Sequence, residues 1–136
     1  MRNEIWLPEM AVGNTIMDAA HESMMQAFCR LSNADDETLR AEFTALTSTM
    51  ESDFCEEENM MEKINFPGLL PHREVHARVL SAMHHAMADL QNGNISAARQ
   101  TVSVLPDWFI LHLSTMDAEL ASAWNAFRTN APVVPM

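Results

Sequence analysis

The stretch "NFPGLLPHREVH", residues 65–76, decides the fold because it separates two helices and places two histidines on the second. Its Pro-Gly pair interrupts the helical pattern that precedes it, and Pro71 suits the first turn of a new helix. On that helix His72 and His76 are four residues apart, so they share one face, about 40° apart around the axis. Two histidines cannot complete a metal site, so further donors must come from elsewhere in the chain.

Scarce glycine, absent tyrosine and helical spacing of apolar residues favour helices throughout the chain. Asn14, Asp35 or Asp36, and Asn94 are the expected N-caps. Pro106 predicts a kink or a short break inside the last helix. The expected elements are an extended arm (1–13), four helices (about 14–31, 35–64, 71–91 and 94–128) and a tail (129–136). Short connections between four helices imply an all-α, up-down-up-down four-helix bundle.

The length of 136 residues fits one domain over residues 1–136, with the bundle at 14–128. The net charge of −11 argues against nucleic acid or an anionic membrane as a partner, and it permits a bound cation. No apolar run is long enough to span a membrane, and the N-terminus does not resemble a signal peptide. Cys29 and Cys55 form no CxxC pair, which favours a reducing compartment and a cytoplasmic location.

Bundle cores can hold metal sites built from side chains on facing helices, and each expected helix offers donors. The candidate ligands are His21, Asp53, Glu57, His72, His76, His112 and Asp117. Asp53 and Glu57 are four residues apart and share a face. The spacing of five between His112 and Asp117 separates them by about 140° on an ideal α-helix, so periodicity alone does not pair them.

Other polar residues near these donors have simpler interpretations. Glu56 and Glu58 belong to an acidic run and are expected on a solvated helix face. His84 and His85 lie about two turns beyond His76, roughly 12 Å along the helix, and are expected at the surface.

Five pieces of the sequence, in a fixed order and spacing over residues 6–117, resemble the bacterial hemerythrins. They are Trp6 in the arm, "VGNTIMDAAH" ending at His21, "DFCEEENMM" beginning at Asp53, "FPGLLPHREVH" ending at His76, and "WFILHLSTMD" ending at Asp117. Each piece alone is a weak signal, but five in register are a strong one. The resemblance implies a four-helix bundle that holds two non-haem irons and binds dioxygen reversibly.

The resemblance also implies roles for the candidate ligands. Three imidazoles, those of His72, His76 and His112, would hold one iron, and His21 would ligate the second. The two remaining carboxylates, Glu57 and Asp117, would bridge both irons alongside an oxo or hydroxo group.

The chain departs from the hemerythrin pattern at two positions. Asp53 stands where the family usually has a histidine ligand, and Ala20 stands where a glutamine usually precedes the first ligand histidine. Aspartate is shorter than histidine, so three outcomes are open: the metal shifts toward Asp53, a water bridges the gap, or the second metal binds weakly. An ionised carboxylate also favours the more oxidised metal, which predicts faster autoxidation.

Met24, Met25, Trp108 and Phe109 lie within a turn of candidate ligands. Core packing is the simpler interpretation, the wall of an oxygen pocket is the functional one, and both can hold.

The expected function is dioxygen binding for carriage, storage, delivery or sensing, with dioxygen or another small gas or anion as partner and a monomer favoured. No Gly-rich phosphate loop or nucleophile–base pair points to an enzyme. An oxygen- or peroxide-reducing enzyme and a bundle with one structural metal are the alternatives that Asp53 leaves open.

Overall fold

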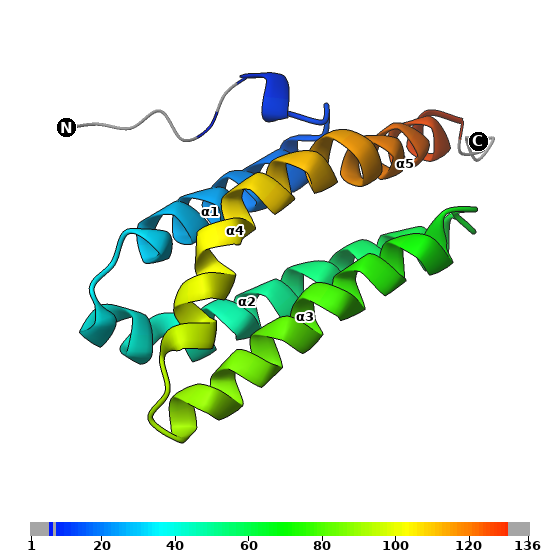
Figure 1. Cartoon of the computed structure of the whole chain (residues 1–136). Helices are drawn as coiled ribbons and strands as arrows, with labels where there is room; N and C mark the ends of the chain where they lie inside the picture. Colours follow the sequence, from blue (N-terminus) through cyan, green and yellow to red (C-terminus); the bar gives the residue numbers. More distant parts are fainter. Residues whose placement is uncertain (1–5, 7, 131–136) are drawn as a thin grey trace.

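The computed structural model describes residue 6 and residues 8–130, and every regular element within them is helical. The elements are the 3-10 turn η1 (Pro8–Met10), the helices α1 (Thr15–Ser32), α2 (Asp36–Lys63), α3 (Leu69–Gln91), α4 (Ser96–His112) and α5 (Ala118–Asn130), and the π-helical turn η2 (Leu113–Asp117). The last two helices and η2 form one rod (Figure 1). Helices α1, α2, α3 and α4 pack in a closed cycle, which confirms the all-α, up-down-up-down bundle.

The first two bundle helices begin at the caps that the sequence predicts. The side chains of Asn14 and Asp35 each accept a hydrogen bond from the backbone N–H three residues later, at 3.0 and 2.8 Å. At α4 the N-cap is Ile95 and not the expected Asn94, which lies one residue earlier and accepts a hydrogen bond from the N–H of Ser96 at 2.9 Å. These are local contacts that Asn and Asp make readily at a helix start.

The turn between α2 and α3 is closed by a left-handed residue. Asn65 has a φ of 53°, and the N–H of Phe66 reaches back to the carbonyl of Met61 at 2.9 Å. Asparagine is the residue other than glycine that adopts this conformation most readily. Helix α3 then begins at Leu69, earlier than expected, and Pro71 lies within its first turn.

The expected break at Pro106 is absent, because α4 continues through this residue to His112. The ribbon of α4 does change direction in its middle, in the yellow part of Figure 1. A proline removes the hydrogen bond to the carbonyl four residues earlier, which bends a helix without necessarily ending it. Leu105 and Phe109 on either side are fully buried, so packing holds both halves of the helix in place.

The arm, expected to be extended, contains one short helical turn where it is described. Residues 1–5 and 7 lie outside the described part of the chain, and Pro8–Met10 form a 3-10 turn closed by a hydrogen bond from the N–H of Ala11 to the carbonyl of Pro8, at 3.1 Å. Proline fixes a φ that suits such a turn. At the other end, α5 runs to Asn130, and residues 131–136 of the expected tail lie outside the description.

Apart from Asn14 and Thr47, the buried polar residues of the bundle gather at one level of an apolar interior. Half of the twelve methionines are buried there, as expected for flexible core filling: Met17, Met24, Met25, Met50, Met61 and Met83. Three histidines from α3 and α4, one from α1, and two acidic residues are buried among them. Within residue 6 and residues 8–130, no helix is long and apolar enough to cross a membrane.

Candidate metal centre

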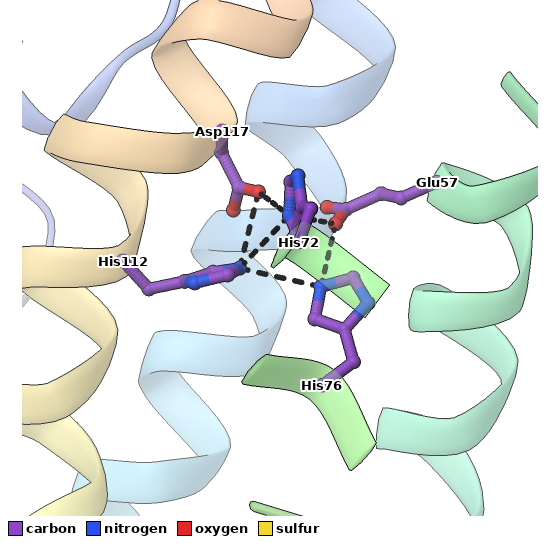
Figure 2. Close-up of side chains that lie close together, drawn as sticks. All are labelled: Glu57, His72, His76, His112 and Asp117. Atoms are coloured by element: carbon purple, nitrogen blue, oxygen red, sulfur yellow. Dashed lines mark hydrogen bonds and ion pairs between the residues drawn. The ribbon is translucent and has the colours of Figure 1, made fainter. Parts of the chain in front are cut away.

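Six of the seven candidate ligands are buried and meet at one level of the bundle. Their side chains come from all four rods, and the residues are His21 on α1, Glu57 on α2, His72 and His76 on α3, His112 at the end of α4, and Asp117 in η2. Figure 2 shows the five that group most tightly, pointing toward a common centre. Each of these five offers one ligand atom within 4.8 Å of the others.

Three imidazoles converge through the same ring nitrogen. The Nε2 atom of His112 lies 3.2 Å from Nε2 of His72 and 3.3 Å from Nε2 of His76 (Figure 2). A neutral imidazole carries one proton and one lone pair, so three such nitrogens facing one point cannot all be satisfied by each other. Neutral imidazole nitrogens at this separation suit a shared cation.

The Glu57 carboxylate divides its two oxygens between two sides of the centre. Its Oε1 atom lies 3.3 Å from Nε2 of His76 and 3.6 Å from Nε2 of His72. Its Oε2 atom lies 2.9 Å from Nε2 of His21, on the side of α1.

Asp117 divides its oxygens in the same way. Its Oδ1 atom lies 3.0 Å from Nε2 of His72 and 3.2 Å from Nε2 of His112, whereas Oδ2 lies 3.3 Å from Nε2 of His21. Each carboxylate thus presents one oxygen to two of the three imidazoles and the other oxygen to His21, an arrangement that suits a bridging ligand.

The π-helical turn explains how two residues five apart share the centre. The N–H of Ala118 donates to the carbonyl of Leu113, the i to i+5 pattern that widens one turn by a residue. His112 and Asp117 then face the same side of the rod, although an uninterrupted α-helix would separate them by about 140°.

The charges within the site are mutually stabilised. Burial alone would raise the pKa of Asp117, but the imidazoles of His112 and His72 beside it and the charges of His112 and His21 hold that pKa well below its usual range. Burial alone would lower the pKa of His21, but its hydrogen bond with Glu57 and the charges of nearby carboxylates outweigh this and raise it. The site therefore favours Asp117 in its charged form, the form that binds metals.

Several buried polar atoms at the centre have no hydrogen-bond partner among the described residues. They are Oε1 of Glu57, both carboxylate oxygens of Asp117, and the Nδ1 atoms of His21, His72 and His112. Burying a carboxylate oxygen without a partner is costly, and a bound cation removes that cost. The donor set of imidazole nitrogens and carboxylate oxygens fits iron, as it fits other transition metals.

Asp53 lies apart from the five tightly grouped donors. It is half-buried and lines a small cavity of about 40 Å³ with His21, Glu57, Ile16 and other residues of α1 and α2. Burial and the charges of its acidic neighbours raise its pKa, against the opposing effect of His21. Asp53 is thus on the His21 side of the site, and its ligation of a metal stays a prediction.

Aromatic rings cover the three-histidine side. The ring of Phe54 stacks on His76 with centroids 3.9 Å apart and an angle of 3° between planes, a neighbour that the sequence analysis did not single out. Trp108 stacks on His112 at 4.9 Å, and Phe109 meets His21 edge-on at 5.7 Å. The proximity of Trp108 and Phe109 agrees with their expected place beside the ligands.

Three other expectations about neighbouring residues have different outcomes. Met24 and Met25 are buried in the apolar core, and their role as an oxygen-pocket wall stays a prediction. His84 and His85 are exposed, as expected. Glu58 is not a solvated residue, because it is half-buried and contacts His76, whereas Glu56 is exposed.

Comparison with known proteins agrees with this site. Residues 12–124 match the Hemerythrin HHE cation binding domain family. The chain is 32% identical over 127 residues to a bacteriohemerythrin of Ralstonia nicotianae, covering 90% of this chain and 89% of that protein. It is 24% identical over 113 residues to myohemerythrins of Riftia pachyptila and Sipunculus nudus, covering 83% of this chain and 87% of each of them. The chain, which carries a buried cluster of metal-binding residues in an all-α bundle, belongs to the hemerythrin family.

Proposed function

We propose that this protein holds two iron ions and binds dioxygen reversibly. The observation that carries the proposal is the division of the carboxylate oxygens of Glu57 and Asp117 between two groups of imidazoles. A site for one ion would need only one of these groups. Membership of the hemerythrin family, whose described domain binds cations, supports the same function.

In this proposal the ligands form two groups, one for each ion, according to the positions of their side chains. His72, His76 and His112 hold one ion, His21 holds the other, and the two carboxylates neutralise and join both. Two irons bound here would supply the electrons that dioxygen binding requires. Dioxygen or another small gas or anion is the proposed partner.

The surrounding residues keep the site dry. Phe54, Trp108 and Phe109 place ring carbons against three of the ligand imidazoles, and a low-dielectric surround strengthens the electrostatic contacts inside. The small cavity beside Asp53 and His21 is the approach that we assign to a diatomic molecule.

Asp53 keeps an enzymatic alternative open. A third carboxylate near the His21 side favours the more oxidised metal and would direct the centre toward reduction of dioxygen or peroxide instead of reversible binding. We also propose a monomer, and a cytoplasmic location. The free thiols of Cys29 and Cys55 support the location, since thiols persist in a reducing compartment.

The test combines metal analysis with gas binding. The iron-loaded protein is expected to contain two irons per chain and to take up and release dioxygen over repeated cycles. A matched pair of variants, Glu57→Gln at the proposed bridge and Glu56→Gln on the exposed neighbour, separates the site from the surface. Glu57→Gln should lose iron, and Glu56→Gln should retain it.

Three results would contradict the proposal in different ways. One iron per chain in the wild type would support a single structural metal. Steady-state turnover of peroxide or dioxygen without a stable oxygenated form would support the enzyme. Equal iron content in both glutamine variants would remove Glu57 from the site.

A further inference from the structure

Among the described residues, His76 is the one site histidine whose Nδ1 atom makes a hydrogen bond. The Nδ1 atom of His76 lies 3.0 Å from Oε2 of Glu58, on the far side of the ring from the centre. An ionised carboxylate can only accept a hydrogen bond, so Nδ1 carries the proton and donates it. The lone pair of His76 is therefore on Nε2, the nitrogen that faces His112 and Glu57.

Glu58 is in turn held by an arginine from the neighbouring helix. Nε of Arg73 donates to Oε1 of Glu58 at 3.3 Å, and a terminal nitrogen of the same guanidinium donates to Glu62 at 2.7 Å. Arg73 is on α3, one turn before His76, whereas Glu58 and Glu62 are on α2. The Arg73–Glu58–His76 chain thus fastens α2 to α3 beside the centre.

The His76 ring is fixed in two directions. The hydrogen bond to Glu58 sets its rotation in the plane, and the parallel ring of Phe54 at 3.9 Å sets the plane itself. By contrast, the buried Nδ1 atoms of His21, His72 and His112 have no partner within the described part of the chain. This difference singles out His76 among the four site histidines.

We propose that Glu58 is a positioning residue for His76, held in place by Arg73, and that it strengthens metal binding on the three-histidine side. This inference rests on the proposed function, because it requires a metal at that position. A carboxylate that accepts from a ligand imidazole fixes the tautomer and makes the metal-facing nitrogen more basic. Loss of such a partner typically weakens metal binding by about 10- to 100-fold.

The test measures binding of cobalt(II) ions, added alone to the metal-free protein, by competition with a chromophoric chelator. Glu58→Ala is expected to weaken binding by about 10- to 100-fold. Glu58→Gln can still accept a hydrogen bond through its amide oxygen but lacks the charge, so we expect a smaller loss of cobalt affinity than in Glu58→Ala. The cobalt affinity of Arg73→Gln should lie between those of Glu58→Gln and the wild type. The matched control is Glu62→Gln, which removes the other acidic partner of Arg73 and leaves the bond to His76 intact.

A second measurement separates positioning from a general loss of stability. Proton NMR of the cobalt-loaded protein should show the Nδ1–H of His76 as the site imidazole proton that exchanges slowest with water. In Glu58→Ala this signal should broaden through exchange, while Glu62→Gln leaves it unchanged. If circular dichroism shows that Glu58→Ala does not fold, cobalt affinity and proton exchange are measured on Glu58→Gln instead.

The possible failures are distinguishable. Equal cobalt affinity in the Glu58 and Glu62 variants, or an unchanged exchange rate of the His76 proton, would overturn this inference and leave the proposed function standing. A wild-type chain that binds no cobalt or iron would overturn both.

Discussion

Replacing Asp53 by histidine should lengthen the lifetime of the oxygenated protein. Asp53 faces the His21 side of the centre, and its pKa is raised by burial and by the charges of Glu56 and Glu57. An ionised Asp53 therefore contributes negative charge where the second metal is proposed. Negative charge stabilises the oxidised metal and speeds the conversion that ends oxygen binding.

The expected magnitude follows from the position of Asp53 on α2. It lies one turn before Glu57, which places the two backbones about 6 Å apart. We take a comparable separation, about 6 Å, between the Asp53 carboxylate and the second proposed metal. At an effective dielectric constant of about 20, one unit charge then changes the energy of another by about 3 kcal/mol. Because Asp53 is only half-buried, solvent and salt screen part of this, and about half remains. The remaining 1.4 kcal/mol or so corresponds to about a tenfold change in lifetime.

The assay follows the visible absorption of the oxygenated protein in air-saturated buffer near neutral pH. Asp53→His should decay about tenfold more slowly than the wild type. Asp53→Asn separates the two contributions, because it removes the charge without adding an imidazole. If charge is the cause, both variants should be long-lived; if ligation is the cause, only Asp53→His should be. Equal decay rates in all three proteins would refute the reasoning.

Three further predictions concern the metal-free protein and do not depend on iron. Asn14→Ala removes the cap of α1 and should lower the free energy of unfolding by about 1 kcal/mol, seen as a melting temperature lower by roughly 4 °C; an unchanged melting temperature would contradict the role of this cap. Phe54→Ala removes the ring that stacks on His76 and leaves a cavity, so urea denaturation should show a loss of about 3–5 kcal/mol, whereas Phe127→Ala, at a residue 40% exposed, should show a much smaller loss. Asp53→Asn should be more stable than the wild type near neutral pH, because burial and acidic neighbours raise the pKa of Asp53 in the folded state. The wild type should have the lower free energy of unfolding once the pH rises through the folded-state pKa of Asp53, and the two proteins should differ least below the unfolded value of 3.8. If the free energies of unfolding of the two proteins change in parallel with pH, this sign is wrong.

The parts of the fold that the sequence predicted correctly depend on local contacts. Asn14 and Asp35 cap their helices through an N–H three residues away, and that contact needs no information from other elements. The start of α3 was placed too late because Pro71 is tolerated anywhere in a first turn, not only at its first position. Of the kink or short break predicted at Pro106, the break is absent, because packing of the surrounding helix decides whether a proline ends it.

Part of the candidate site could also be predicted from the sequence, for a different reason. His21, His72, His76 and His112 could be grouped because buried donors on several helices must point into the same core. Glu58 was misassigned, because an acidic run is normally solvated and nothing in the run itself shows that His76 and Arg73 stand opposite one of its members. Such a contact depends on the register between two helices, which periodicity along either helix does not fix.

The π-helical turn η2 shows most clearly that side-chain contacts at the site determine the local backbone conformation. Two α-helical turns take about seven residues, so a regular helix with Phe109 buried would direct residue 116 inward on the same stripe. Met116 is instead only half-buried, and Asp117 is fully buried beside three imidazoles. One extra residue in η2 makes this shift, and Leu120 and Ala121 then continue the buried stripe in the new phase. The contacts of Asp117 offset the weaker hydrogen bonding of a widened turn, and they join residues on three other elements. Tertiary contacts at the centre therefore specify the π-helical turn. In the sequence, this turn is visible only as the spacing of five residues between His112 and Asp117, which does not fit a regular α-helix.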